Sequence, residues 1–144
     1  MPPDFPADKK DLIETLLAQP VLAHLGTANP KTNQPHVVPV WFLWDGQHIW
    51  ISAFSSTRKF KDLTRNPLCA VLIEPEKSGS LQAVLFEGPA ELIDQPPGLV
   101  SEMSLRIYTR YMGNEGAQAA EPQSWAVDPE NRLVKLIPSH IYTW

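Results

Sequence analysis

Cysteine is almost absent from this chain of 144 residues, and its single cysteine, Cys69, cannot form an internal disulfide. A reducing, cytoplasmic location is therefore the simpler expectation. Long apolar runs are also missing, since none comes near the roughly 20 residues that a helix needs to span a bilayer. The first ten residues, MPPDFPADKK, lack the apolar core of a secretory signal. The sequence predicts no membrane segment.

Basic charge is scarce as well. The chain has 12 Lys and Arg residues against 16 Asp and Glu residues, which gives a formal net charge of -4 at pH 7. A chain that binds nucleic acid broadly would favour a basic face, because phosphate contacts supply much of the affinity. The composition therefore argues against a nucleic-acid partner, while it leaves room for a local basic patch.

The signatures of several enzyme classes are also missing. The sequence has no G-x-G-x-x-G or Walker loop, which argues against a Rossmann or P-loop site, and no G-x-S-x-G nucleophile motif. No metal site is expected, because the four histidines show neither an H-E-x-x-H motif nor close paired spacing. Cys69 follows an apolar, strand-like pattern and is expected to belong to the core. The sequence thus predicts no catalytic set of side chains.

What the chain has instead is a composition suited to one folded domain. Its length is that of an ordinary single domain over 1–144, and its hydrophobic fraction of 43% is sufficient to build a core. Prolines are abundant, 15 in number, so the predicted elements are short and sharply bounded. The Pro-rich residues 1–7 are predicted to form an N-terminal arm.

Hydrophobic patterns predict about six strands and three helices, without the strand-helix alternation that a parallel sheet requires. The predicted strands cover 21–27, 36–44, 48–54, 68–74, 81–93 with a bend or bulge at Gly88-Pro89, and 132–144 with a bend at Pro138. The predicted helices lie over 8–19, within 55–67 and over 98–112, and the polar segment 113–123 is expected to be a loop. Tight turns such as Asp45-Gly46 join consecutive strands, which favours an antiparallel sheet that closes into a barrel.

The most informative segment is SSTRKFKDL, which begins at Ser55. Three hydroxyl residues precede a predicted helix, and the free N–H groups and positive dipole end of a helix attract an anion. Arg58 and Lys59 add two positive charges at that end, where basic residues are unfavourable unless an anion is bound. The segment predicts a phosphate site. The alternative is that Ser56 or Thr57 only caps the helix and the basic residues face solvent.

The hairpin before this segment, VVPVWFLWDGQHIWISAF, is rich in tryptophan. Strand alternation places Trp41 and Leu43 on one face and Phe42 and Trp44 on the other, so both faces are apolar. Such a strand lies either between two layers or at a subunit interface, and a barrel core with a dimer contact is the more ordinary interpretation. A planar ring system would also fit against it and bind its backbone by hydrogen bonds.

These motifs follow a specific order: a strand ending ISAF, then SSTRKFKDLTRNP, an apolar strand, FEGPAEL and the closing RLVKLIPSHIYTW. From about Ile13 to Trp144, this order resembles the pyridoxamine 5′-phosphate oxidase-like family of split-barrel flavoproteins. The chain is most similar to its short members, which include FMN-binding proteins and deazaflavin-dependent reductases. The resemblance implies a mainly β fold, a six-stranded antiparallel split β-barrel with short flanking helices. It also implies a homodimer with two cofactor sites at the subunit interface.

The resemblance further implies which residues bind the cofactor. The phosphate of FMN would be held by the hydroxyl and basic residues Ser56, Thr57, Arg58 and Lys59. The isoalloxazine ring would lie along the strand of Val38, Pro39, Val40 and Trp41. Ser52 and Ala53 would contact the ribityl chain or the ring. The partner subunit would close the site with its FEGPAEL strand or the loop around Trp125.

The function that the resemblance implies is an oxidoreductase in which FMN transfers hydride or electrons to a small substrate that the sequence does not identify. Members that oxidise pyridoxamine phosphate carry a longer C-terminal segment with basic and His residues, so vitamin B6 oxidation is not expected. Two alternatives stay open. One is a deazaflavin-dependent reductase, for whose acidic tail Lys31, Lys61 and Arg65 would supply charge. The other is a non-catalytic protein that binds or stores flavin or heme.

Overall fold

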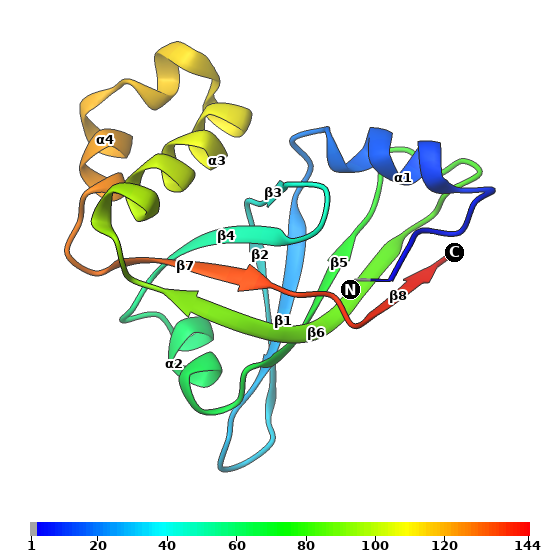
Figure 1. Ribbon diagram of the computed structural model, residues 1–144, viewed down its shortest axis with the longest axis horizontal. Helices are drawn as coiled ribbons and strands as arrows, with labels where there is room; N and C mark the ends of the chain where they lie inside the picture. The colour runs from blue at the N-terminus through cyan, green and yellow to red at the C-terminus, as the bar shows by residue number, and fades with distance from the viewer. Residues whose placement is uncertain (1–2) are drawn as a thin grey trace.

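The computed structural model describes residues 3–144, which form eight strands and four helices (Figure 1). The strands are β1 (Ala23–Ala28), β2 (Pro35–Val40), β3 (Leu43–Trp44), β4 (Ile49–Phe54), β5 (Leu68–Ile73), β6 (Val84–Ile93), β7 (Asn131–Leu136) and β8 (His140–Thr143). The helices are α1 (Lys10–Leu17), α2 (Arg58–Arg65), α3 (Pro97–Ala117) and α4 (Ala120–Ala126). No helix in this described part of the chain is both long and apolar enough to cross a membrane.

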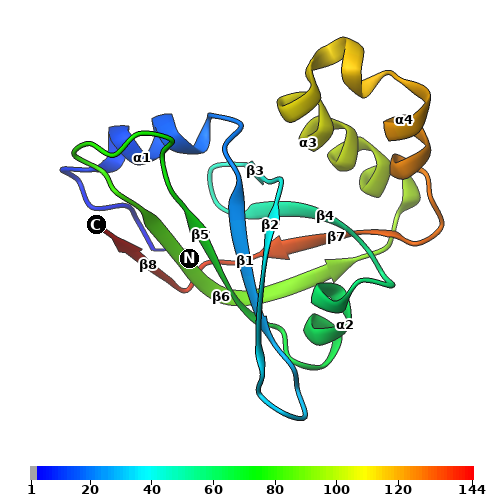
Figure 2. The same ribbon diagram turned by 180° about the vertical axis from the view of Figure 1, so that it is seen from behind.

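All strands belong to one antiparallel sheet that curls into a split barrel. The hydrogen-bonded order is β2-β1-β5-β6-β7-β4-β3, and β8 pairs with the first half of β6. Strand β6 turns the sheet, because its residues 84–89 pair with β5 and its residues 90–93 pair with β7. Figures 1 and 2 show β1, β2 and β5 running across the direction of β4 and β7. The predicted mainly β, split-barrel fold with flanking helices is therefore confirmed.

The bend in β6 depends on a close approach of two backbone segments at Gly88. The chain after β7 crosses β6 here, where the Ile137 N–H donates to the Pro89 carbonyl and the Ser139 N–H donates to another carbonyl of β6. A methyl group at Gly88 would overlap the carbonyl oxygen of Ile137, so glycine is required for this crossing. Pro138 lies between the two donors and has no N–H for a ladder, so β7 ends before it.

The strand count exceeds the predicted six because two expected strands are interrupted. The segment 132–144 divides into β7 and β8 at the crossing just described. The segment 36–44 divides into β2 and β3 because helix α3 binds the backbone of Phe42. The Phe42 N–H donates to the Tyr111 hydroxyl at 3.2 Å, and Arg110 Nε donates to the Phe42 carbonyl at 3.0 Å. These side chains replace the strand partner that Phe42 would otherwise have.

The loop predicted over 113–123 is wrong, since this segment is largely helical. Helix α3 continues through a kink at Gly113, where φ is +76°, and α4 follows after a short turn. Gly113 absorbs the change of direction, and Pro122 occupies the first turn of α4, where no N–H is needed. Ala117 and Ala126 are both buried in the cluster that α3 and α4 form. This burial stabilises the two helices, although the polar composition of the segment suggested a loop.

Two apolar clusters lie within the described part of the chain. The larger lies inside the barrel and includes the fully buried Phe42, Ile51 and Phe86. The smaller lies between α3, α4 and the outer faces of β4 and β7, around Ile107 and Leu133. Because α3 is anchored by this second cluster, its side chains are held over the open edge of the barrel.

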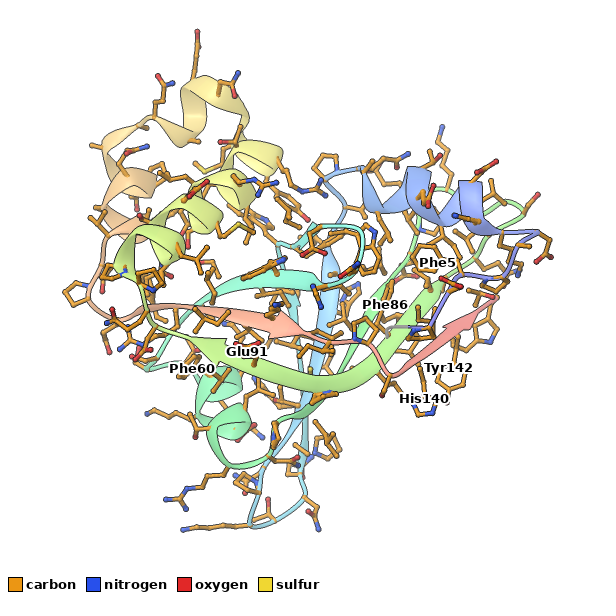
Figure 3. All side chains as sticks on the ribbon, in the orientation of Figure 1. Phe5, Phe60, Phe86, Glu91, His140 and Tyr142 are labelled. Atoms are coloured by element: carbon orange, nitrogen blue, oxygen red, sulfur yellow. The ribbon has the colours of Figure 1, made fainter. Side chains whose placement is uncertain are left out.

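Residues 3–9 precede α1 and reach one end of the barrel. Phe5 packs against Trp44 and Phe86, with ring centroids 5.6 and 6.2 Å apart, and Figure 3 shows Phe5 beside Phe86. The predicted N-terminal arm, residues 1–7, begins outside the described residues. Its described part is joined to the barrel through Phe5.

Candidate functional site

The split of the barrel lies between two strands that each have an unpaired edge. In residues 3–144, β2 stands at one end of the strand order and pairs only with β1. Residues 51–54 of β4 pair with β7 on one side, while β3 covers only residues 49 and 50 on the other. Backbone N–H and C=O groups along these edges are available to a ligand, as on any exposed sheet edge.

Two adjoining hollows open along this split, with volumes of about 340 and 290 Å³. They share the side chains of Trp41, Ser52, Lys59 and Tyr108, so we treat them as one site and call it the split hollow. The first part is completed by Leu22, Pro39, Val40 and Ile107, and the second part by Ala53, Phe54, Thr57 and Trp125. The site thus combines β2, β4 and the start of α2 with helices α3 and α4.

Seven of the ten residues predicted to bind the cofactor line the split hollow. They are Pro39, Val40, Trp41, Ser52, Ala53, Thr57 and Lys59. Val38 packs against the barrel core and is not among the lining residues. Ser56 and Arg58 lie at the start of α2, outside the lining. The structure therefore brings the predicted ring, ribityl and phosphate segments together at one place.

Lys59 is the cation of the split hollow. Its side chain is half-buried, and burial lowers the pKa of its ammonium group. Within residues 3–144, no carboxylate oxygen lies within 4.0 Å of Lys59, whereas Arg58 and Lys135 both have ion-pair partners. A partly desolvated positive charge without a counter-ion is unfavourable until a ligand supplies the anion.

Arg58 faces its own helix rather than the hollow. Its Nε lies 3.8 Å from Oδ2 of Asp62, one turn later in α2. The same carboxylate oxygen accepts a hydrogen bond of 3.2 Å from the Thr27 hydroxyl, which ties α2 to β1. The two basic residues that are adjacent in the sequence therefore differ in the fold: Arg58 is paired with a buried carboxylate, and Lys59 is not.

The start of α2 lacks the side-chain cap that the sequence predicts. Thr57 occupies the N-cap position, but its hydroxyl donates a 2.7 Å hydrogen bond to the Phe54 carbonyl instead of accepting one from the helix. The N–H groups of the first turn stay without that partner, next to Lys59. Uncapped amides beside a cation are suited to binding a phosphate or a carboxylate.

Three aromatic side chains form one wall of the split hollow. Trp41 stacks on Tyr111 behind it, with centroids 4.9 Å apart and an interplanar angle of 4°. Tyr108 meets Trp41 edge-on at 6.3 Å and Trp125 edge-on at 5.7 Å. Flat apolar walls of this kind suit a planar ring system. Trp125, which the resemblance assigned to the partner subunit, lines the hollow of its own chain from α4.

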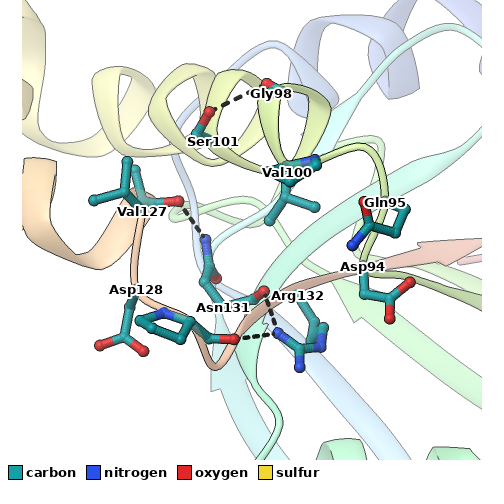
Figure 4. Close-up of a pocket in the computed structure, with 12 residues that line it drawn as sticks. Asp94, Gln95, Gly98, Val100, Ser101, Val127, Asp128, Asn131 and Arg132 are labelled. Carbon is teal, nitrogen blue, oxygen red and sulfur yellow. Dashed lines mark hydrogen bonds between the residues drawn. The ribbon is translucent and has the colours of Figure 1, made fainter.

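Asn131 links the split hollow to a neighbouring one. It accepts a 2.9 Å hydrogen bond from the Ser52 hydroxyl, and it also lines a hollow of about 350 Å³ at the start of α3. Figure 4 shows this neighbouring hollow, where Arg132 donates to the backbone carbonyls of Pro129 and Asn131. Because its guanidinium binds the chain's own backbone, Arg132 differs from the unpaired Lys59.

The sequence patterns reveal neither the hollow residues that come from α3 nor Asn131 of β7, which binds the hollow residue Ser52. Ile107 and Tyr108 fall within the predicted helix over 98–112. The apolar spacing of that helix predicts core contacts and does not predict a role for the Tyr108 hydroxyl. Asn131 lies 79 residues after Ser52, and no local motif connects them. The sequence offers one signal for Tyr108: it directly follows Ile107, which belongs to the apolar face of the predicted helix.

The fold defines a split-barrel protein, and the split hollow combines aromatic walls with a half-buried lysine. The sequence model described as pyridoxamine 5′-phosphate oxidase matches residues 10–144, which is nearly the whole chain. The chain therefore belongs to the pyridoxamine 5′-phosphate oxidase family. No curated protein matches it in sequence.

Three solved structures illustrate the similarity in fold. A conserved hypothetical protein from Mycobacterium tuberculosis has a TM-score of 0.78 at 21% identity, over 94% of this chain and 83% of that chain. A protein titled F420 reductase has a TM-score of 0.73 at 22% identity, over 90% and 94% of the two chains. HutZ, a heme storage protein from Vibrio cholerae, has a TM-score of 0.73 at 14% identity, over 93% of each chain. At these identities the likeness shows the fold alone.

Proposed function

We propose that the chain binds FMN in the split hollow and works as a flavin-dependent oxidoreductase. The observation that carries this proposal is the half-buried Lys59, which has no carboxylate partner in residues 3–144 and lies beside the uncapped start of α2. Membership of the pyridoxamine 5′-phosphate oxidase family supports a flavin as the ligand. The aromatic wall and the free edge of β2 are the surfaces that a flavin ring needs.

The residues of the split hollow fit the parts of FMN. Lys59, Thr57 and the first amides of α2 would hold the phosphate. The residues beside the ribityl chain would be Ser52 and Ala53, and those beside the isoalloxazine ring Pro39, Val40 and Trp41. When bound, the flavin supplies the hydride or electron transfer, while the protein binds it, orients it and excludes water. The substrate would be a small molecule that enters beside the ring.

A deazaflavin is the second candidate cofactor, because one similar structure is titled F420 reductase. Its ring would occupy the same place, and its longer acidic tail would pass α2, where Lys61 and Arg65 are exposed. A third candidate is a non-catalytic role in binding or storing flavin or heme, which the likeness to the heme storage protein HutZ supports. The three candidates differ in the ligand that binds and in whether the bound ligand is reduced.

An absorbance spectrum of the freshly purified protein, followed by a fluorescence titration with FMN, tests the proposal. Flavin bands in the spectrum, or saturable quenching of FMN fluorescence, would support FMN binding. Reduction of the bound flavin by NADH or NADPH, with turnover of an acceptor, would support the oxidoreductase. Binding of deazaflavin alone would select the second candidate, and tight FMN binding without reduction would select the third. A protein that binds neither ring would overturn the proposal.

The lowered pKa of Lys59 predicts that FMN binding weakens as the solution becomes alkaline. Burial disfavours the charged ammonium, so the pKa of Lys59 lies below 10.5 and the attraction for phosphate is lost as pH rises through it. In the unliganded protein, the free energy of unfolding depends on pH in the opposite direction to the FMN affinity. The unfolded chain holds this proton more tightly, so the Lys59 contribution to the free energy of unfolding rises with pH in the same window.

FMN titrations from about pH 7 to about pH 10 measure this dependence, in the range just below the ordinary lysine pKa. The Lys59→Ala variant is the control, since it has no ammonium to titrate. A parent protein whose FMN affinity is as pH-independent as that of the variant would contradict the assignment of the phosphate to Lys59.

We also propose that the chain works as a homodimer. On the outer face of the sheet, strand register places Val37, Gly26 and Ala70 in one row, which continues through Glu87 to His140. The next row contains His24, Leu72, Leu85 and Tyr142. Val37 is 66% exposed and Tyr142 is 46% exposed, so apolar side chains of this face are open to solvent in the single chain. A second copy of the chain would cover it, and the contact would lie close to the split hollow because β2 contributes to both.

Val37→Glu should convert this dimer to a monomer, because it places a carboxylate without a partner inside an apolar contact. Size-exclusion chromatography with light scattering measures the change. Leu12→Glu is the matched control, since Leu12 is 42% exposed on α1, away from the outer face of the sheet. A monomeric parent, or a Val37→Glu variant that stays dimeric, would refute the proposed interface.

A further inference from the structure

A buried hydrogen-bond network ends in the split hollow at Tyr108. Its members come from β4, α3 and β7 and are Ser52, Ser104, Tyr108 and Asn131. The Ser52 oxygen lies 2.9 Å from Asn131 Oδ1, 3.1 Å from the Ser104 hydroxyl and 3.3 Å from the Tyr108 hydroxyl. Ser104 is fully buried and Asn131 is 3% exposed, whereas Ser52 and Tyr108 line the hollow.

The direction of the hydrogen bonds in this network follows from one backbone carbonyl. Asn131 Nδ2 lies 3.2 Å from the Ala126 carbonyl oxygen, which only accepts, so the amide must present its nitrogen there. Asn131 Oδ1 then faces Ser52, and Ser52 donates its single proton to it. The other Nδ2 proton goes to the Ser104 oxygen at 2.9 Å, which leaves Ser104 to donate to Ser52.

The Tyr108 proton is the one that this network binds least tightly. Ser52 and Ser104 have both given their protons to other partners, so neither donates to the Tyr108 oxygen. Tyr108 is therefore the donor in its contact with Ser52, whose oxygen has a second lone pair beside the one that Ser104 uses, but this contact is long, at 3.3 Å. Burial raises the pKa of Tyr108, so its hydroxyl stays protonated well above neutral pH. Tyr108 is thus a hydrogen-bond donor without a short partner at the wall of the hollow.

We propose that Tyr108 donates a hydrogen bond to an acceptor atom on the ring of the bound cofactor, and that Asn131 is the positioning residue that fixes this polarity. The inference rests on the proposed function, since it requires a flavin-type ring in the split hollow. Tyr108 lines both parts of that hollow, between Trp41 and Trp125. The site therefore favours a ligand with an acceptor at this point over one with a donor, because Ser52 directs its own proton away from the hollow.

Tyr108→Phe tests the donor role in the full chain, with FMN as the probe, because it removes only the hydroxyl. We expect the Kd for FMN to rise about two- to tenfold, the usual range for one neutral hydrogen bond. The absorption bands of bound FMN should also shift, since a hydrogen bond to the ring alters its electronic transitions. Tyr142→Phe is the matched control: it removes the same group from an exposed side chain of β8 that does not line the hollow, so the Kd and the absorption bands should not change.

Asn131→Ala tests the positioning role through a double-mutant cycle. Without the Asn131 acceptor, Ser52 is free to donate to the Tyr108 oxygen, so the Tyr108 proton is no longer shared with Ser52 and FMN binding should tighten. In a Tyr108→Phe background the same change should bring no gain in affinity, because its effect passes through the lost hydroxyl. An equal change in affinity in both backgrounds would overturn the positioning role of Asn131.

The outcomes also separate this inference from the proposed function. If the parent binds FMN and Tyr108→Phe leaves both the Kd and the bands unchanged, the donor role is overturned while FMN binding stands. If the parent binds no FMN, both are overturned. Circular dichroism establishes that each variant is folded, and should Asn131→Ala not fold, the comparison of Tyr108→Phe with Tyr142→Phe alone decides the donor role.

Discussion

Lys59→Ala should weaken FMN binding by about 1.5–3 kcal/mol, or roughly ten- to a hundredfold in Kd, the usual contribution of a hydrogen bond to a charged group. The physical reason is that Lys59 is half-buried in the split hollow and has no carboxylate partner in residues 3–144. A ligand phosphate is the counter-ion that this site lacks, and partial burial limits its screening by salt. Fluorescence titration of FMN against the two proteins measures the difference.

Two controls isolate the phosphate contact. Lys61→Ala removes an exposed charge from the same helix outside the hollow lining, so it should leave the Kd nearly unchanged. Riboflavin has the same ring without the phosphate, so its affinity should not depend on Lys59. Equal FMN affinity in the parent and in Lys59→Ala would show that the phosphate is bound elsewhere.

Gly88→Ala should lower the free energy of unfolding by about 3 kcal/mol, at the upper end of the usual cost of overpacking. The added methyl would overlap the Ile137 carbonyl oxygen and lie 3.0 Å from the Ser139 nitrogen. Both atoms are backbone, and both residues donate hydrogen bonds to β6, so neither segment can move away without loss. Urea unfolding followed by tryptophan fluorescence gives the free energy of unfolding.

Gly98→Ala is the matched control for this change. No atom lies within 4 Å of a methyl group placed at Gly98, which is in the first turn of α3. Alanine is favoured over glycine in a helix, so this variant should be as stable as the parent or slightly more stable. If Gly88→Ala unfolds at the same urea concentration as Gly98→Ala, the crossing of the two segments does not need glycine.

Local patterns predicted most of the strands, because alternation and turn residues act over a few neighbouring positions. The strand expected over 48–54 is β4, which begins one residue later and ends as predicted, and the Asp45-Gly46 turn precedes it. The interruption of the segment 36–44 could not be predicted in this way. It arises because Arg110 and Tyr111, 68 and 69 residues later, bind the backbone of Phe42.

The helical pair α3–α4 shows a second limit of local reasoning. Asn, Gly and Pro in the segment 113–123 are residues that usually mark loops. The segment is helical because Gly113 supplies one kink and the buried Ala117 and Ala126 pack within the cluster over β4 and β7. That stabilisation comes from tertiary packing, which often overrides intrinsic propensity.

By itself, the sequence determined a mainly β chain and a basic segment at the start of a short helix, since these features depend on neighbouring residues. Only the tertiary structure decided that Arg58 pairs with Asp62 while Lys59 faces the hollow with no carboxylate partner among residues 3–144. It also brought Tyr108 and Asn131 to Ser52 from positions 56 and 79 residues later. Burial and hydrogen-bond partners of this kind are set by how strands and helices pack together, so they are properties of the whole folded chain.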